Sequence, residues 1–226
     1  MMRVSSREIR GVVLDMDGVL VDSEPFLHEA LNTVLGANDR APLSFDGYAR
    51  YVGASDEFIW DDLVCRLRLQ QSVEFYRDQY DTCVIDLYRQ RSTITSGTTR
   101  LLDALSAEGI PLAVASSSRR SWVDTCLQSL GIRAYFEVVV DGEMVDLPKP
   151  DPAIYHLAAR RLRVAPDECM AVEDAPRGIT AAVTAGMLTA AVDTPYTRPH
   201  DTGAAHLRVQ SLDDLVERVA AFVTRV

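Results

Sequence analysis

The chain has 226 residues, of which 47% are hydrophobic and 25% charged, values that are ordinary for a packed globular protein and disfavour a disordered or fibrous one. Its net charge of -10 disfavours nucleic acid as a partner, because proteins bind a phosphate backbone through clustered Lys and Arg. The sequence shows neither a membrane span nor the apolar run of a secretory signal, so we expect no membrane partner and a cytoplasmic location.

The first predicted strand, GVVLD at residues 11–15, is followed by a stretch with helical patterns and no strand pattern. This stretch contains FLHEALNTVL, DEFIWDDLVCRL and VEFYRDQYDTCVIDLY. Pro25 stands at its start and the pair Ser96–Gly97 follows its end, which suits two hinges. We therefore predict an inserted α-helical cap domain over residues 24–91, and a core domain formed by residues 1–23 and 92–226.

After the insertion, helical patterns alternate with short apolar segments rich in Val and Ala. Segments of this kind, without polar alternation, are typical of strands that are buried on both faces. The alternation predicts an α/β fold with a doubly wound, Rossmann-like parallel sheet and right-handed crossovers. In chain order, the predicted elements are helix 97–108, strand 111–117, helix 119–130, strand 136–140, helix 152–163, strand 169–174, helix 176–185, strand 188–192 and a final helix at 211–226, which a Ser-x-x-Asp cap begins.

The segment DMDGVLVDSEP follows directly on the first apolar run. Because residues i and i+2 of an extended segment project to the same side, Asp15 and Asp17 are predicted to face the crevice beyond the end of the strand. A D-x-D-G string arises by chance in on the order of one in ten sequences of this composition. Two aspartates after a strand are also typical of a turn or a helix cap, so this segment alone is weak evidence for a site.

Three further groups of polar residues stand just after predicted strands. Ser116–Ser118 lead into a helix, where hydroxyls and free N–H groups can bind an anion. Lys149, the one lysine of the chain, lies between two prolines before a helix, and Glu173 and Asp174 end a strand ahead of another helix. Taken singly, the serines are typical of a helix cap, Lys149 of a solvated cation, and Glu173 and Asp174 of a polar loop. Parallel strands bring their ends to one edge of a sheet, so together the groups favour an active site.

These motifs, in this order, resemble the four-motif signature of the haloacid dehalogenase superfamily: DMDGVLVDSEP, Ser116, Lys149 in KPDP, and VEDAPRGITAAVTAGM. The resemblance covers nearly the whole chain. The helical insertion after the first motif is similar to the branch that contains β-phosphoglucomutase and many sugar-phosphate phosphatases. The resemblance implies an enzyme that hydrolyses a small phosphorylated metabolite, such as a sugar phosphate, through an aspartyl-phosphate intermediate.

Four carboxylates in one crevice would repel one another and resist ionisation unless a divalent cation lay among them. Oxygen ligands from carboxylates, water and a substrate phosphate suit Mg²⁺, which we predict as the cofactor. The resemblance implies that Asp15 and Asp174 bind the ion through their side chains and Asp17 through its carbonyl. Glu173 is expected either to bind the ion as well or to hold a residue that does.

Four residues are predicted to perform the catalysis. A carboxylate nucleophile at Asp15 divides one difficult displacement into two easier steps. Asp17 would protonate the leaving oxygen and then deprotonate the acceptor, as a general acid and base. Lys149 would neutralise both the phosphate and Asp15, and Ser116 would hold the phosphoryl oxygens together with a neighbouring amide.

Substrate contacts are expected from the cap and from the loop after the second strand. We predict that the substrate-binding residues are Gly53, Ser55, Ser117, Ser118 and Arg119. No pattern in these segments names the molecule that binds. The expected partner is a small phosphorylated metabolite, and the expected state of the protein is a monomer or a weak dimer.

Two other activities of the superfamily are excluded by the residues at single sites. The dehalogenases lack the second aspartate, because a halide leaves without protonation, whereas Asp17 is present here. The phosphonatases need a cap lysine for a Schiff base, and residues 24–90 contain none. Phosphoryl transfer therefore remains as the predicted reaction.

Water is predicted to be the acceptor, which makes the enzyme a phosphatase. The mutase carries an arginine that holds a second phosphate where this chain has Asp56, and a carboxylate there would repel that phosphate. A phosphosugar mutase remains the alternative, because Arg119 and Arg120 could replace the missing contact and His28 falls near the mutase's hinge histidine. A catalytically silent binding protein on the same scaffold is a further alternative.

Overall fold

A six-stranded parallel sheet forms the centre of the protein in the computed structural model, which describes residues 8–197 and 203–222. The strand order is β3-β2-β1-β4-β5-β6, and every pairing between neighbours is parallel. This order confirms the doubly wound, Rossmann-like α/β fold predicted from the sequence. The strands are β1 (Gly11–Leu14), β2 (Leu112–Ala115), β3 (Val138–Val140), β4 (Cys169–Glu173), β5 (Leu188–Val192) and β6 (Leu207–Val209).

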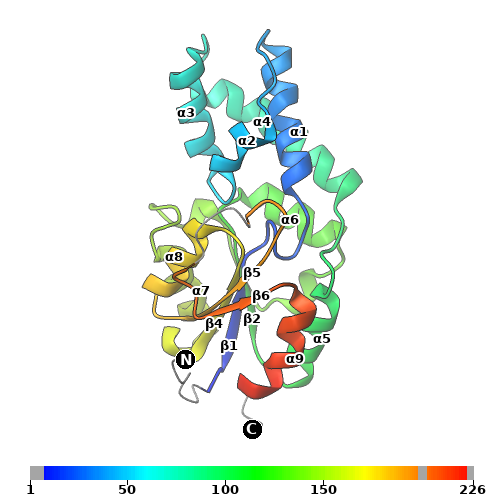
Figure 1. Cartoon of the computed structure of the whole chain (residues 1–226), viewed down its shortest axis with the longest axis vertical. Helices are drawn as coiled ribbons and strands as arrows, with labels where there is room; N and C mark the ends of the chain where they lie inside the picture. Colours follow the sequence, from blue (N-terminus) through cyan, green and yellow to red (C-terminus); the bar gives the residue numbers. More distant parts are fainter. Residues whose placement is uncertain (1–7, 198–202, 223–226) are drawn as a thin grey trace.

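Helices cover both faces of the sheet, which explains why its strands lack polar alternation. Val12 and Leu14 of β1 pack into the hydrophobic core on one face, and Val13 packs into a second core on the other. Helices α7 and α8 cover the Val13 face, and α5, α6 and α9 contribute to the opposite core (Figure 1). Their bounds are α5 (Thr98–Ala107), α6 (Arg120–Ser129), α7 (Ala153–Leu162), α8 (Pro176–Thr184) and α9 (Leu212–Phe222).

The inserted segment forms a group of helices above the carboxyl ends of the strands (Figure 1). A serine caps the start of three of these helices, because the side chains of Ser44, Ser55 and Ser72 each accept a hydrogen bond from the amide three residues on. The boundaries of a separate cap domain stay a prediction, and "cap" below names residues 24–91. Its helices are α1 (Glu24–Ala37), α2 (Phe45–Tyr48), α3 (Asp56–Leu67) and α4 (Val73–Arg91).

Strands β6 and β3 and helix α2 differ from the predicted elements. Strand β6 was not predicted, because it has three residues and a charged one at its centre. Strand β3 begins at Val138 instead of residue 136, since a turn of 3₁₀ helix over Arg133–Tyr135 precedes it. The short helix α2 was also missed. The predicted final helix is α9, whose cap is confirmed by a 3.2 Å bond from the Asp214 amide to Ser211 Oγ, and residues 223–226 lie outside the described residues.

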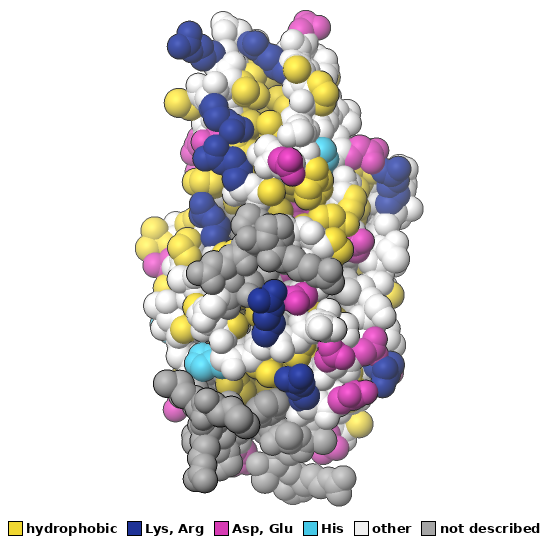
Figure 2. Space-filling view, in the orientation of Figure 1, with side chains coloured by type: hydrophobic (Ala, Val, Ile, Leu, Met, Phe, Trp, Pro, Cys, Tyr) yellow, Lys and Arg dark blue, Asp and Glu magenta, His cyan; other side chains and the backbone are white. Residues whose placement is uncertain are grey.

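The face drawn in Figure 2 carries both signs of charge. Acidic and basic side chains are interspersed with apolar ones on it. The basic side chains in this view are arginines, because Lys149 is only 4% exposed. Among the residues that the structure describes, no helix combines the length and the apolar character that a bilayer crossing requires.

Candidate active site

Strands β1 and β4 lie side by side where the strand order of the sheet reverses. From β1 the chain continues to β2 on one side, whereas β4 leads to β5 on the other. Open α/β sheets bind ligands in the crevice beyond the strand ends at this point. Leu14 pairs with Val172, so Asp15 and Glu173, one residue further along each strand, meet in that crevice.

Gly18 allows the loop after β1 to pass directly against the loop after β4. Its φ of +80° lies in the left-handed region that favours glycine. A Cβ atom at this position would lie 2.2 Å from Oδ2 of Asp174. The glycine of the D-x-D-G motif therefore brings the first and last acidic motifs together.

Lys149 is the centre of a buried polar network. Its Nζ atom donates to Oδ1 of Asp15 and to Oε1 of Glu173, each at 2.6 Å, and to the carbonyl oxygen of Ala115 at 3.0 Å. These bonds use all three protons of the ammonium group. Burial lowers the pKa of Lys149, but the charges of Asp15 and Glu173 outweigh burial and hold that pKa above its ordinary value. Lys149 is therefore a fixed cation.

Glu173 accepts hydrogen bonds on both carboxylate oxygens. Oε1 accepts from Lys149 and from the hydroxyl of Tyr155 at 2.6 Å. Oε2 accepts from the amides of Asp174 and Ala175 at 3.1 and 3.3 Å. A carboxylate offers about four lone-pair sites, and these four donors occupy them. The bonds favour a role for Glu173 in orienting Lys149 over a role as a metal ligand.

Three buried carboxylates converge at the ends of β1 and β4. Asp15, Glu173 and Asp174 each place an oxygen within 4.8 Å of the others. Burial, followed by repulsion from Glu173, raises the pKa of Asp15 and of Asp174 well above the ordinary value of an aspartate. A hard divalent cation would relieve this repulsion and accept oxygen ligands of this kind. The donor set therefore fits Mg²⁺, with Asp15 and Asp174 as the better-placed side chains.

The side chain of Asp17 is held by three hydroxyl groups and does not belong to this cluster of three carboxylates. Ser23 and Tyr88 donate to its Oδ1 at 2.6 and 2.5 Å, and Ser118 donates to Oδ2 at 2.8 Å. Tyr88 comes from α4 of the cap, whereas the other two belong to the core. Nothing in the sequence indicated Tyr88. The cap therefore contacts the predicted general acid directly.

We expect Tyr88→Phe to slow turnover roughly ten- to hundredfold while the affinity for Mg²⁺ stays unchanged, because a hydrogen bond to a charged group contributes about 1.5–3 kcal/mol. The measurement is kcat as a function of pH, together with a Mg²⁺ titration. Tyr76→Phe is the matched control, since Tyr76 is a buried cap tyrosine whose hydroxyl accepts from the Gln71 amide instead. An unchanged kcat and pH profile in Tyr88→Phe would show that Asp17 is oriented without this bond.

The cap encloses a small cavity over the carboxylates. Its volume is about 30 Å³, and one water molecule needs on the order of 10–15 Å³ by the same measure. Gly53 has a φ of +72°, and a Cβ atom there would lie 2.5 Å from the Cβ of Ala175, so the cap loop rests directly on the loop after β4. A ligand much larger than a water molecule would therefore need the cap to move off the core.

The predicted substrate-binding residues divide between two places. Gly53 and Ser117–Ser118 line the cavity, whereas Ser55 and Arg119 line an adjoining depression between cap and core. Ser116 is fully buried, and its Oγ accepts a bond from the amide of Ser118 at 3.1 Å. Ser116 is not one of the described residues that line the cavity. Glu24 and Tyr48 line the cavity and were not predicted.

Asp56 does not face the cavity as a free carboxylate, which corrects the argument made from the sequence. Its Oδ2 accepts from Nε of Arg77 and from Nε of Arg119, both at 2.7 Å, and the side chain is 5% exposed. The two guanidinium groups neutralise its charge. Simple repulsion by a bare carboxylate therefore cannot be the reason that a second phosphate is rejected.

Comparisons with known proteins agree with this geometry. The family described as haloacid dehalogenase-like hydrolase matches residues 9–186. The phosphorylated carbohydrates phosphatase of Thermotoga maritima is 30% identical over 179 residues, which cover 79% of this chain and 82% of that protein. The phosphoglycolate phosphatase of Escherichia coli K12 is 26% identical over 231 residues, and the match covers 92% of each chain. The crystal structure of CbbY from Rhodobacter sphaeroides in complex with phosphate is 26% identical, covers 92% of this chain and 96% of that one, and has a TM-score of 0.83. The chain is therefore a member of the haloacid dehalogenase-like hydrolase family, which confirms the resemblance seen in its motifs.

Proposed function

We propose that the protein is a Mg²⁺-dependent phosphatase that hydrolyses a small phosphorylated metabolite of the sugar-phosphate class. The observation that carries the proposal is the buried network in which Lys149 joins Asp15 to Glu173 beside Asp174, at the switch point of the sheet. The phosphatases among the relatives support the reaction type.

The reaction uses Asp15 as the nucleophile. Lys149 offsets part of the charge of Asp15 and fixes its orientation, so that an anionic phosphate can approach it. Attack on phosphorus forms the bond from Asp15 to the phosphoryl group and breaks the ester bond, while Asp17 gives its proton to the leaving oxygen. In the second step Asp17 takes a proton from water, which attacks phosphorus, releases phosphate and regenerates Asp15.

Magnesium would be held by the side chains of Asp15 and Asp174 and by the main-chain carbonyl of Asp17. When bound, it neutralises charge on the transferring phosphoryl group and on the carboxylates. Burial and repulsion from Glu173 raise the pKa of Asp15 and of Asp174, so both carboxylates are unfavourable in their charged forms. A bound cation would stabilise those charged forms, which supports this assignment.

Water is the acceptor in this proposal, because the residues that kept the mutase alternative open are engaged elsewhere. A ring nitrogen of His28 lies 2.7 Å from the carbonyl oxygen of Leu43, within the cap. Arg120 pairs with Asp124, and its side chain is 60% exposed. Arg119 is bound to Asp56. In the described part of the chain, the cavity lining does not include His28, Arg119 or Arg120.

A panel of phosphorylated metabolites, assayed for free phosphate with Mg²⁺, tests the proposal. We expect steady phosphate release from at least one monophosphate, and its loss when a chelator removes the metal. A second incubation contains β-glucose 1-phosphate and a trace of glucose 1,6-bisphosphate. Efficient formation of glucose 6-phosphate with little free phosphate would identify a mutase instead, and binding without any turnover would identify a silent protein.

A further inference from the structure

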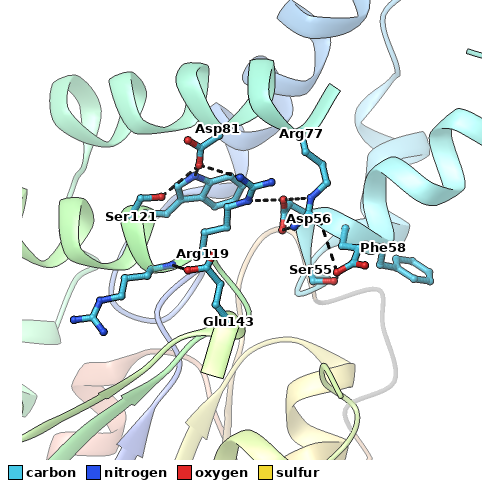
Figure 3. Close-up of polar contacts among 11 residues, drawn as sticks. Ser55, Asp56, Phe58, Arg77, Asp81, Arg119, Ser121 and Glu143 are labelled. Carbon is cyan, nitrogen blue, oxygen red and sulfur yellow. Dashed lines mark hydrogen bonds and ion pairs between the residues drawn. The ribbon is translucent and has the colours of Figure 1, made fainter. Parts of the chain in front are cut away.

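Two guanidinium groups meet on one carboxylate at the boundary between cap and core. Arg77 comes from α4 of the cap, and Arg119 directly precedes α6 of the core (Figure 3). Both donate through Nε to Oδ2 of Asp56 at 2.7 Å, and Nη2 of Arg77 lies 3.3 Å from Oδ1. Paired guanidinium groups of this kind are a typical binding site for an anion. Here the anion is a side chain of the protein itself.

Asp56 belongs to the wall of the catalytic cavity as well as to the adjoining depression that contains the two arginines. It is 5% exposed, and the side chains of Arg77 and Arg119 are 22% and 18% exposed. Arg119 also lies 3.7 Å from Asp81, through Nη1. Both arginines are therefore bound to carboxylates of the cap while the cap is closed.

The remaining charges in the cavity wall are almost all negative. In the described part of the chain, Lys149 is the one cation of the lining, and its three protons are donated to protein oxygens. The acidic lining residues are Asp15, Asp17, Asp56 and Glu173, together with Glu24, whose pKa is raised by burial. The metal site would bind the phosphate of a substrate. The rest of the substrate would meet no unpaired positive charge in this wall.

The carboxyl group of Glu24 in the cap can form hydrogen bonds with an uncharged ligand. Glu24 is 2% exposed, and its Oε2 accepts a bond from the hydroxyl of Tyr48 at 2.7 Å. Burial raises the pKa of Glu24 to about 8, although the bond from Tyr48 opposes this shift. A neutral carboxyl can donate to a substrate hydroxyl as well as accept from it. Tyr51 and Tyr80 of the cap and Trp122 of α6 also line the cavity, and their polar atoms donate to oxygens of the protein.

We infer that Asp56 is a specificity-determining residue whose carboxylate takes the place of a second anionic group, so that the substrate is a monophosphate with an uncharged, hydroxyl-bearing leaving part. The inference rests on the proposed phosphatase function. A substrate with a second phosphate or a carboxylate would have to displace Asp56 from two guanidinium groups, while the displaced charge stayed beside it in the wall. A hydroxyl-bearing leaving part meets neither obstacle.

The first test uses the wild-type protein and two substrates of matched size. Phosphoglycolate carries a carboxylate at the position where 2-hydroxyethyl phosphate carries a hydroxymethyl group. We expect kcat/KM for 2-hydroxyethyl phosphate to be about tenfold higher or more, because the carboxylate of phosphoglycolate would have to displace Asp56 from its two arginines and would then lie beside that displaced charge. Equal values, or a preference for phosphoglycolate, would overturn the role of Asp56.

The second test is Asp56→Asn, which keeps the shape of the side chain and frees the two guanidinium groups. The ratio of kcat/KM values should move toward phosphoglycolate by about tenfold, chiefly through a lower KM for the acid. Glu57→Gln is the matched control, because Glu57 lies 4.0 Å from Arg77, is 67% exposed and does not line the catalytic cavity. It removes the same charge from the same arginine and should leave the ratio unchanged.

The double variant Asp56→Asn/Arg119→Gln should lose the gain for phosphoglycolate, because that gain depends on the freed guanidinium. An unchanged ratio in a folded Asp56→Asn protein, checked by its melting temperature, would contradict the inference. Should Asp56→Asn fail to fold, the wild-type ratio still decides. Absence of Mg²⁺-dependent hydrolysis from every ester would reject the proposed function itself, whereas a wild-type preference for phosphoglycolate would reject only the role of Asp56.

Discussion

Asp15→Asn is expected to abolish turnover, with a loss on the order of 10⁴-fold or more in kcat. An amide nitrogen or oxygen at this position cannot form the acyl phosphate that divides the reaction into two steps. The variant also loses the carboxylate that accepts the 2.6 Å bond from Lys149. The measurement is phosphate release at saturating Mg²⁺ and substrate, together with mass spectrometry of quenched wild-type protein to detect phosphate bound to Asp15.

Asp17→Asn is the matched control for that experiment, because it makes the same change two residues along the chain. In the proposed mechanism Asp17 transfers protons and makes no covalent bond, so its loss should slow both steps by about 10²- to 10⁴-fold without abolishing them. Its side chain does not belong to the group of three carboxylates that lie within 4.8 Å of one another, so metal affinity should be largely retained. Substantial activity in Asp15→Asn, in a metal-saturated assay, would refute the covalent mechanism.

The second large effect is expected for Lys149→Arg, which keeps the charge and should still cost roughly a hundredfold or more in kcat/KM. The ammonium group is 4% exposed and is enclosed by Asp15, Glu173 and the carbonyl of Ala115, at 2.6, 2.6 and 3.0 Å. A planar guanidinium is larger and directs its donors in a fixed fork, so it cannot make the same three contacts without displacing the carboxylates.

Lys149→Met and Arg120→Lys provide the comparison for this result. The methionine variant removes the charge at a similar length, and we expect an impairment at least as severe as that of Lys149→Arg. Arg120 is exposed and pairs with Asp124, so its exchange for lysine should leave kcat/KM unchanged. Wild-type rates in Lys149→Arg would show that the single lysine of the chain is an accident of composition.

The convergence of the core motifs was predictable because their positions follow from local patterns. Each motif stands at the end of an apolar run, and parallel strands bring their carboxyl ends to one edge of the sheet. Asp15 and Glu173 therefore meet across neighbouring strands, although they lie 158 positions apart along the chain. The contact between Lys149 and these carboxylates follows from the same topology.

Contacts between cap and core were not predictable from the sequence. The helical pattern of the cap shows which faces of α1 and α4 are buried, but it does not show which core residue each side chain meets. Tyr88 reaches Asp17 across 71 positions of the chain, and Asp56 reaches Arg119 across 63. Such pairs depend on the angle at which the cap lies on the core, which no local pattern encodes. For this reason the sequence did not show that the carboxylate of Asp56 is paired with two arginines.

The burial of Lys149 also gives the protein a chemical reporter for the state of its active site. Since no other lysine exists in the chain, an amine-directed reagent that modifies a lysine side chain must have reached the network beside Asp15. The extent of that modification, followed by mass spectrometry during opening of the cap or in rising denaturant, measures exposure of the catalytic centre at a single atom. For the same reason, immobilising the protein through lysine coupling would modify the group that binds Asp15, the proposed nucleophile.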